Sequence, residues 1–261
     1  MLRHHEESIR NTVDYFERLP EVEALLLGGS IAHGLARPDS DVDVLILVSD
    51  ERHAELARAE DLMFFNRELC AYPDGYVDGK YLRRAFLEQV AERGSEPARF
   101  AFQDARVLFS RVGGLDRLLA RIVRYPVEGR TERMRRFYAQ LEAWYWYSTE
   151  ALRLENRYLL TVSLGKLVLF GGRLILAHNE ILYPYHKWFI DILKNAEDRP
   201  ADLLDRIQKL HDEPSRQSIT EFYETIRDFR DWPRPATVWS NQFHLDSELN
   251  WLTGPTPIDD L

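Results

Sequence analysis

Apolar positions along the chain follow two different patterns, and the pattern changes near residue 126. In the first part, short runs of β-favouring apolar residues alternate with stretches of helical period. The runs predict strands at residues 22–28, 41–48, 76–82 and 105–110. The stretches predict helices at residues 5–18, 50–67, 83–93 and 114–124. This alternation is typical of an α/β or α+β domain.

After Pro126 and Gly129, which mark a connection, nearly the whole chain has a helical pattern. One amphipathic face is formed at three- and four-residue steps by Phe137, Leu141, Trp144, Ser148 and Leu152. Further helices are predicted at residues 158–179, 185–195, 200–211 and 215–230. From Trp232 onward, four prolines and several aromatic residues without a period predict an extended tail. We therefore expect two domains, residues 1–125 and an all-helical second domain over residues 126–261.

Composition and charge limit which molecules the protein is expected to bind and where in the cell it is expected to be. The net charge of −9 is spread along the chain without a basic cluster, which makes a nucleic-acid partner unexpected. Cys70 is the only cysteine, and the N-terminus lacks the apolar run of a secretory signal. The most apolar stretch, residues 160–177, is interrupted by Lys166 and Arg173, so we interpret it as a protein helix and not a membrane span. These features favour a cytoplasmic protein.

Residues 25–48, LLLGGSIAHGLARPDSDVDVLILV, combine two glycines, a serine and three aspartates between two apolar runs. Gly28 and Gly29 allow a sharp turn or the close approach of a ligand, because neither carries a Cβ. Ser30 stands where an N-cap residue would begin a short helix. Backbone N–H groups and a hydroxyl at such a turn are suited to phosphate.

Three carboxylates are expected to converge next to this turn. Asp41 and Asp43 lie two residues apart at the start of a strand, so their side chains share one face, roughly 7 Å apart by strand rise. Asp78, in the apolar run YVDGKYL, can join them from a neighbouring strand. Such carboxylates favour Mg²⁺ and a two-metal site for phosphoryl transfer. Asp39, which follows Pro38, is instead interpreted as a turn residue.

The Gly29-Ser30 pair, ten intervening residues, Asp41 and Asp43, and a later apolar-flanked Asp78 together resemble the polymerase-β-like nucleotidyltransferase superfamily. The helical second half resembles the aminoglycoside nucleotidyltransferase branch of that superfamily. The resemblance implies an α+β fold, with a small mixed sheet backed by helices and followed by a helical bundle. It also implies attack of a substrate hydroxyl on the α-phosphorus of ATP or another nucleoside triphosphate, with release of pyrophosphate.

The resemblance further implies roles for individual residues. Asp41 and Asp43 would hold two Mg²⁺ ions, and Asp78 would complete this metal site or take the hydroxyl proton. Gly29 and Ser30 would bind the β- and γ-phosphates. Arg173 and Lys187 lie in an order comparable with the triphosphate-binding Arg and Lys of related enzymes. The general base stays open between Asp78 and three glutamates of the helix at residues 133–157, which are Glu142, Glu150 and Glu155.

Three functions remain open at this point. The first is transfer of AMP to a hydroxyl of a small acceptor, which could be aminoglycoside-like because an acidic cleft suits a polycation. The second is modification of a protein side chain, as in some toxin–antitoxin pairs. The third is nucleotide binding for regulation without turnover, although the full set of Asp41, Asp43 and Asp78 argues against it. The aromatic helical half could supply the surface of a homodimer.

Overall fold

The computed structural model describes residues 1–256 of the chain. The chain divides into two compact units, Met1–Arg124 and Tyr125–Leu261. This division lies one residue from the boundary expected from the sequence. We call these parts unit 1 and unit 2.

Unit 1 is built on a five-stranded mixed sheet with the strand order β3-β4-β2-β1-β5. The strands are β1 (Val22–Leu27), β2 (Val42–Val48), β3 (Met63–Asn66), β4 (Val77–Leu82) and β5 (Arg106–Ser110). The central strand β2 pairs antiparallel with β1 and parallel with β4. Strands β5 and β3 each add antiparallel at an edge. The expected mixed sheet is thus confirmed.

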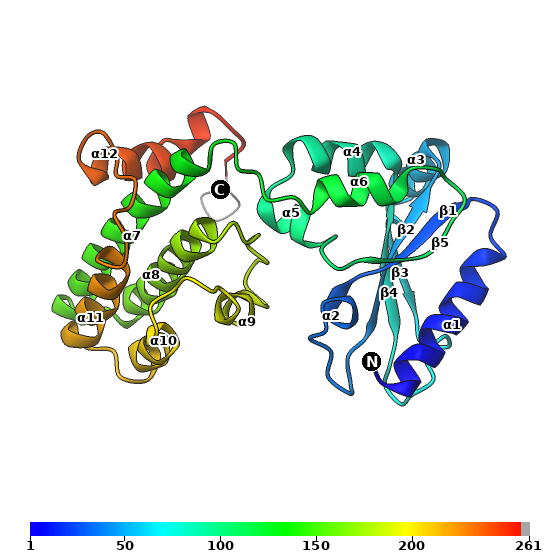
Figure 1. Cartoon of the computed structure of the whole chain (residues 1–261), viewed down its shortest axis with the longest axis horizontal. Helices are drawn as coiled ribbons and strands as arrows, with labels where there is room; N and C mark the ends of the chain where they lie inside the picture. Colours follow the sequence, from blue (N-terminus) through cyan, green and yellow to red (C-terminus); the bar gives the residue numbers. More distant parts are fainter. Residues whose placement is uncertain (257–261) are drawn as a thin grey trace. The chain divides into compact units, whose positions relative to one another are not determined.

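Helices cover both faces of this sheet (Figure 1). They are α1 (Arg3–Glu17), α2 (Gly29–Ala32), α3 (Asp50–Arg58), α4 (Arg84–Arg93), α5 (Glu96–Phe100) and α6 (Leu115–Ile122). Helix α1 packs on one face, where Phe16 meets Leu25 and Leu27 in one apolar cluster. Helices α4 and α6 pack on the other face, around Leu26 and Leu47. Side chains alternate along a strand, so β1, β2, β4 and β5 each contribute to both clusters.

The sequence prediction was wrong over the second half of residues 50–67. Helix α3 ends at Arg58, and the chain then forms edge strand β3 in place of a continued helix. Ser49 caps the start of α3 by accepting a hydrogen bond from the Arg52 N–H at 3.2 Å. The short helix α5 was also not predicted; Ser95 caps it, with Pro97 in its first turn.

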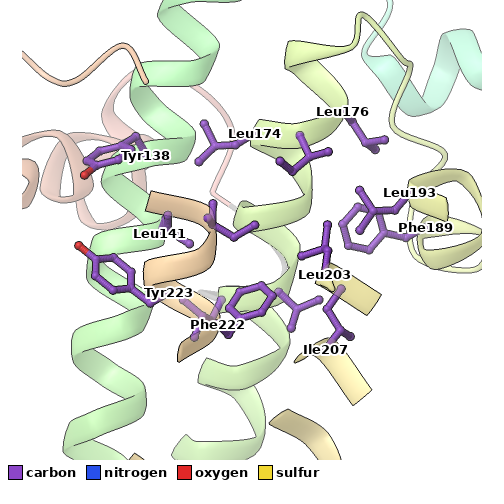
Figure 2. Close-up of a cluster of buried hydrophobic side chains, with 14 of the residues drawn as sticks. Tyr138, Leu141, Leu174, Leu176, Phe189, Leu193, Leu203, Ile207, Phe222 and Tyr223 are labelled. Carbon is purple, nitrogen blue, oxygen red and sulfur yellow. The ribbon is translucent and has the colours of Figure 1, made fainter. Parts of the chain in front are cut away.

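Unit 2 is helical. Its helices are α7 (Arg130–Arg153), α8 (Arg157–His178), α9 (Phe189–Lys194), α10 (Leu203–Asp212), α11 (Arg216–Arg227) and α12 (Trp239–Phe243). Figure 2 shows the core, where Leu141 of α7, Leu174 of α8 and Phe222 of α11 are among the buried side chains. The expected helical second half is thus confirmed.

Helix α8 is long and apolar enough to cross a membrane by length and composition alone. Half of its most apolar window is buried inside the protein, and Leu167 and Ile175 are fully buried. Gly171 and Gly172 lie against the rings of Phe222 and Phe189, so they allow two other segments to approach α8 closely. In this structure α8 packs as a core helix of unit 2.

The expectation of an extended tail from Trp232 was wrong over residues 239–252, and the last part of that tail, residues 257–261, lies outside the described residues. Helix α12 continues into a π-helical turn, η1 (His244–Glu248), and a 3-10 turn, η2 (Asn250–Leu252). Phe243 is buried and lies 6.1 Å, centroid to centroid, from Trp144 of α7. Packing against α7, which the sequence pattern cannot reveal, holds this segment in helical turns.

Candidate active site

Asp41, Asp43 and Asp78 come together at one end of strands β2 and β4. Each offers a carboxylate oxygen, and these three atoms all lie within 4.8 Å of one another. All three residues are half-buried. The structure therefore brings together the three carboxylates that the sequence singled out.

The parallel pairing of β2 with β4 explains this convergence. Asp43 and Asp78 are direct partners in the register, and neighbouring strands lie only about 4.8 Å apart. Asp41 precedes β2 by one residue, on the same face as Asp43. Gly79, next to Asp78, has no room for a side chain, since a Cβ there would lie 2.7 Å from the Val44 carbonyl oxygen.

The turn after β1 packs directly against this cluster. The Gly28 N–H donates a hydrogen bond to the Asp43 carbonyl at 2.9 Å. Gly29 has a φ of +61°, and a Cβ built on it would lie 1.7 Å from Asp43 Oδ2. A side chain at position 29 would therefore occupy the place of the Asp43 carboxylate. The glycine is needed both for its backbone conformation and for this contact.

Ser30 is buried beside the turn, with 5% of its surface exposed. The N-cap role predicted for it was wrong, because Gly28 occupies that position and Ser30 lies inside the short helix α2. Within residues 1–256, its buried Oγ has no hydrogen-bond partner. An unsatisfied buried hydroxyl is costly in a folded protein, so Ser30 Oγ is the kind of group that a ligand satisfies.

Tyr76 is a member of this cluster that the sequence analysis missed. Its phenol lies close enough to the Asp41 carboxylate to feel the charge of that group. The charge of Asp41 is the main cause that raises the pKa of the Tyr76 phenol, and Asp78 and Asp43 act in the same direction. Tyr76 lies two residues before Asp78, and this spacing on a strand was a signal that their side chains share a face.

The residues present fit a magnesium site. Three carboxylate oxygens this close repel one another, and Mg²⁺ prefers carboxylate oxygens as protein ligands. Two ligands of one Mg²⁺ ion span up to about 4.2 Å, and paired ions lie about 3.5 to 4 Å apart. The limit of 4.8 Å on the spacing of the three oxygens is of the same order as these distances.

The other predicted residues belong to unit 2 and have different surroundings. Arg173 lines a cavity of that unit, with its guanidinium between the rings of Phe137 and Tyr183. Lys187 is exposed, and its ammonium lies 5.1 Å from the Trp188 ring centre. Lys187 is not among the residues that line the Arg173 cavity. The common role predicted for Arg173 and Lys187 stays a prediction.

Two of the three glutamates considered as general bases, Glu142 and Glu150, have partners within unit 2. Glu142 accepts a hydrogen bond from the Tyr223 hydroxyl at 2.8 Å. Glu150 forms a salt bridge with Arg153, which lowers the pKa of its carboxyl. Glu155 follows α7 with a φ of +51°. Asp78 is the candidate base that lies within the carboxylate cluster.

Comparison with known proteins agrees with this geometry. Residues 9–96 match the model of the nucleotidyltransferase domain family. This stretch contains the Gly29-Ser30 turn and all three aspartates. Unit 1 thus holds a nucleotidyltransferase domain, and the protein is an enzyme of the nucleotidyltransferase class.

Among solved structures, the chain is similar to a nucleotidyltransferase-like protein from Exiguobacterium sibiricum. The two share 11% sequence identity at a TM-score of 0.48, over 98% of this chain and 83% of that chain. Among curated proteins, none matches the chain in sequence.

Proposed function

We propose that this protein transfers a nucleoside monophosphate, AMP from ATP, to a hydroxyl group of a small acceptor and releases pyrophosphate. The observation that carries this proposal is the set of three carboxylate oxygens within 4.8 Å of one another, packed against Gly29 of the glycine-serine turn. This arrangement suits a magnesium nucleotide, because it offers carboxylates for the metal and a turn with a buried hydroxyl for the phosphates.

Each residue of the site has a task in this reaction. Asp41 and Asp43 would hold Mg²⁺, while Ser30 Oγ and the Gly29 backbone would bind the terminal phosphates. When bound, the ions stabilise charge on the attacking and leaving oxygens. The acceptor oxygen forms a bond to the α-phosphorus, and the bond from that phosphorus to pyrophosphate breaks. We assign the proton of the acceptor hydroxyl to the carboxylate of Asp78, which lies in the same cluster.

Tyr76 would position Asp41 in this scheme. A hydrogen bond from its hydroxyl to the nearby Asp41 carboxylate would orient the remaining oxygen lone pairs of that carboxylate. The raised pKa of Tyr76 keeps the phenol neutral, so it can donate such a bond and adds no negative charge to the cluster.

We expect Asp43→Asn to abolish magnesium-dependent ATP binding while the protein stays folded. The substitution removes a ligand charge without changing the size of the side chain. Loss of one such ligand is expected to cost about a hundredfold or more in transfer rate, since metal ions contribute several kcal/mol. Calorimetric titration of ATP with and without Mg²⁺, into the wild type and the variant, measures the binding step without knowledge of the acceptor.

Asp39→Asn is the matched control for Asp43→Asn. Asp39 lies four residues away on an exposed turn, 3.4 Å from Arg37, and outside the carboxylate cluster. The Asp39→Asn variant should bind magnesium-ATP with the affinity of the wild type. Equal, metal-dependent binding by the wild type and Asp43→Asn would contradict the metal assignment.

The acceptor is to be found by screening for pyrophosphate release. The screen contains polycationic aminoglycosides, neutral sugars, acidic metabolites and hydroxyl-bearing protein segments. The aminoglycosides follow from the aminoglycoside-like interpretation of the sequence. The protein segments follow from the alternative in which the enzyme modifies a protein. We place the reaction in the cytoplasm, where nucleoside triphosphates are abundant. Metal-dependent ATP binding with no release of pyrophosphate from any acceptor would favour a regulatory nucleotide-binding role.

A further inference from the structure

An exposed pair of aromatic side chains lies beside the carboxylate cluster of unit 1. The ring centres of Phe65 and Tyr76 are 5.1 Å apart, and their ring planes are tilted by 34°. Phe65 belongs to β3, the edge strand of the sheet, and 59% of its surface is exposed. We call Phe65 and Tyr76 the aromatic pair. Large apolar side chains that gather on a surface mark places where a protein binds other molecules.

Alternation along β3 places Phe65 on the same face of the sheet as the carboxylates. Phe64 packs against Phe16 of α1, with ring centres 4.8 Å apart, so the next residue, Phe65, points to the opposite face. Val44 of β2 also belongs to the apolar cluster around α1, and its neighbour Asp43 therefore shares the face of Phe65. The aromatic pair and the carboxylates are thus on one side of the sheet.

The strand register brings Phe65 next to Asp78. The two residues are direct partners in the antiparallel pairing of β3 with β4, and the Cβ atoms of such partners lie about 4.5 to 5.5 Å apart. Tyr76 lies two residues before Asp78, and the three aspartates all raise the pKa of its phenol, Asp41 most strongly. Both rings therefore border the carboxylate cluster.

The aromatic pair and the glycine-serine turn lie on opposite sides of the carboxylates. In the strand order β3-β4-β2-β1, Asp78 of β4 and Asp43 of β2 occupy the middle. Gly29, which follows β1, lies against Asp43 on one side, and Phe65 lies beside Asp78 on the other. The cluster is therefore flanked by the turn assigned above to the phosphates and by an aromatic surface.

This order matches the geometry of the proposed transfer. In a displacement at phosphorus, the attacking and the leaving oxygens lie roughly in line on opposite sides of the phosphorus. With the terminal phosphates at the turn after β1, pyrophosphate leaves on that side. The attacking hydroxyl then arrives from the side of β4, next to Asp78 and Phe65. A ring that carries this hydroxyl would lie against the aromatic pair.

The surroundings of Phe65 favour a ring with an uncharged face. The guanidinium carbon of Arg67 lies 5.6 Å from the Phe65 ring centre, and a second cation at this ring would be repelled by it. An anion would face the carboxylate cluster and the negative faces of the two rings. An aromatic ring, or the apolar face of a sugar ring, gains free energy from burial against the pair.

We propose that the aromatic pair binds a ring of the acceptor, so that the acceptor is a hydroxylated ring compound, a sugar or a phenol, with an uncharged face. This inference rests on the proposed transfer reaction, because only a transferase has an acceptor. Phe65 contacts the acceptor ring, and Tyr76 extends the same surface towards Asp41. Contact with the ring holds the acceptor hydroxyl beside Asp78, which takes its proton.

The test measures pyrophosphate release from magnesium-ATP with three probes. Methyl glucoside supplies a sugar ring, phenol supplies an aromatic ring, and glycerol has hydroxyl groups without a ring. Phe65→Ala removes a ring that is 59% exposed, so the fold is retained, and Phe65→Tyr keeps a ring at the same position. Phe86→Ala is the matched control, because Phe86 is 40% exposed on α4, which follows the end of β4 opposite to Asp78.

We expect at least one ring probe to support faster pyrophosphate release than glycerol, and the probe that does so distinguishes a sugar from a phenol. Phe65→Ala should raise the KM for that probe about tenfold, the effect of losing one stacking contact, with little change in kcat. Phe65→Tyr and Phe86→Ala should keep the KM of the wild type. Calorimetry should give the same affinity for magnesium-ATP in Phe65→Ala and the wild type, because the pair binds the acceptor and not the nucleotide.

Several results would contradict this assignment. Ring probes that react no faster than glycerol, or an unchanged KM in Phe65→Ala, would show that the pair does not bind the acceptor. Loss of magnesium-ATP affinity in Phe65→Ala would assign the pair to the nucleotide base. Dissociation of a homodimer by Phe65→Ala, measured by sedimentation, would make the pair an interface between two copies of the chain.

The proposed function is tested separately by the binding of magnesium-ATP. Binding by the wild type that Asp43→Asn abolishes would support the nucleotide site whatever the ring probes do. Absence of such binding would contradict the proposed function itself. Failure of the proposed function and failure of this inference are therefore distinguishable.

Discussion

At the scale of single residues, Gly29 and Asp43 form one packing unit. The sequence predicted that both belong to the site, because a glycine-serine pair and two alternating aspartates have recognisable chemistry. It could not predict that the Asp43 carboxylate lies directly against the Gly29 α-carbon. That contact depends on the register between β1 and β2, which a residue pattern does not contain.

Gly29→Ala should therefore lose magnesium-dependent nucleotide binding, because its Cβ would displace the Asp43 carboxylate. Gly34→Ala is the matched control, since Gly34 has a φ of +72° and nothing lies within 4 Å of its Cβ position. Both variants should lose about 1 to 2 kcal/mol of stability from the left-handed backbone. Urea unfolding measures that loss, and calorimetry measures binding. Nucleotide binding by Gly29→Ala at wild-type strength would show that the contact does not matter.

Arg173 and Lys187 illustrate that the order of residues along the chain does not establish whether they bind the same ligand. Their order predicted one shared ligand, but the structure places Arg173 between two aromatic rings in a cavity and Lys187 on the surface. The other two arginines of that cavity come from a different helix, α7. A cluster assembled from side chains of two helices leaves no spacing pattern in the sequence.

At the scale of elements, strands bounded by turn residues were predicted well, whereas the shortest strand was not. The strands β1, β2, β4 and β5 lie within one residue of their predicted ends, because their apolar runs are bounded by turn residues. The sequence pattern predicted a helix at the position of strand β3. Its four residues, Met63–Asn66, form an edge strand with an apolar run too short to distinguish the two by period.

Gly172 and Gly165 of α8 allow a prediction about helix packing. A Cβ on Gly172 would lie 2.3 Å from Phe189 Cζ, so Gly172→Ala should destabilise unit 2 by about 1 to 3 kcal/mol through overpacking. Gly165, on the same helix, is exposed and has nothing within 4 Å. Gly165→Ala should instead stabilise the helix by up to about 1 kcal/mol. Urea denaturation followed by circular dichroism compares the two, and equal effects of both substitutions would contradict the close packing at Gly172.

At the scale of the whole molecule, the stability of unit 1 should depend on pH through two buried histidines. Burial lowers the pKa of His5, and the neighbouring His4 acts in the same direction. Burial against Phe100 also lowers the pKa of His33, although Asp104 partly opposes this effect. Below the ordinary histidine pKa of about 6.5, the unfolded chain binds protons that the folded chain excludes. Stability is therefore present above that pH and decreases as the pH falls below it.

His33→Phe should reduce this pH dependence, because the substitution keeps the aromatic contact with Phe100 and removes the titrating group. The measurement is urea unfolding at several values between pH 8 and pH 5. His211→Gln, at an exposed position in unit 2, is the control and should leave the slope unchanged. If the free energy of unfolding changes with pH equally in His33→Phe and the wild type, His33 does not contribute to the pH dependence.

The change from a mixed sheet to a helical second half could be predicted because the period of the apolar residues changes along the chain. Alternating strands and helices predict a domain built on a sheet. The continuous helical pattern after Gly129 predicts a domain made of helices. The turns after Trp232 could not be predicted in this way. Their helical form depends on packing of Phe243 against α7, which is a tertiary contact.

The hydrogen bond between Gly28 and Asp43 has a consequence for how relatives of this protein are recognised. It closes the base of a surface loop, and the antiparallel pairing of Leu27 with Val44 fixes the same two ends. Because the cost of closing a loop rises only slowly with its length, residues can be gained or lost between Ser30 and Asp41 while the motifs at both ends keep their places. A search pattern that demands ten intervening residues would therefore overlook proteins with the same constellation and a longer or shorter hairpin.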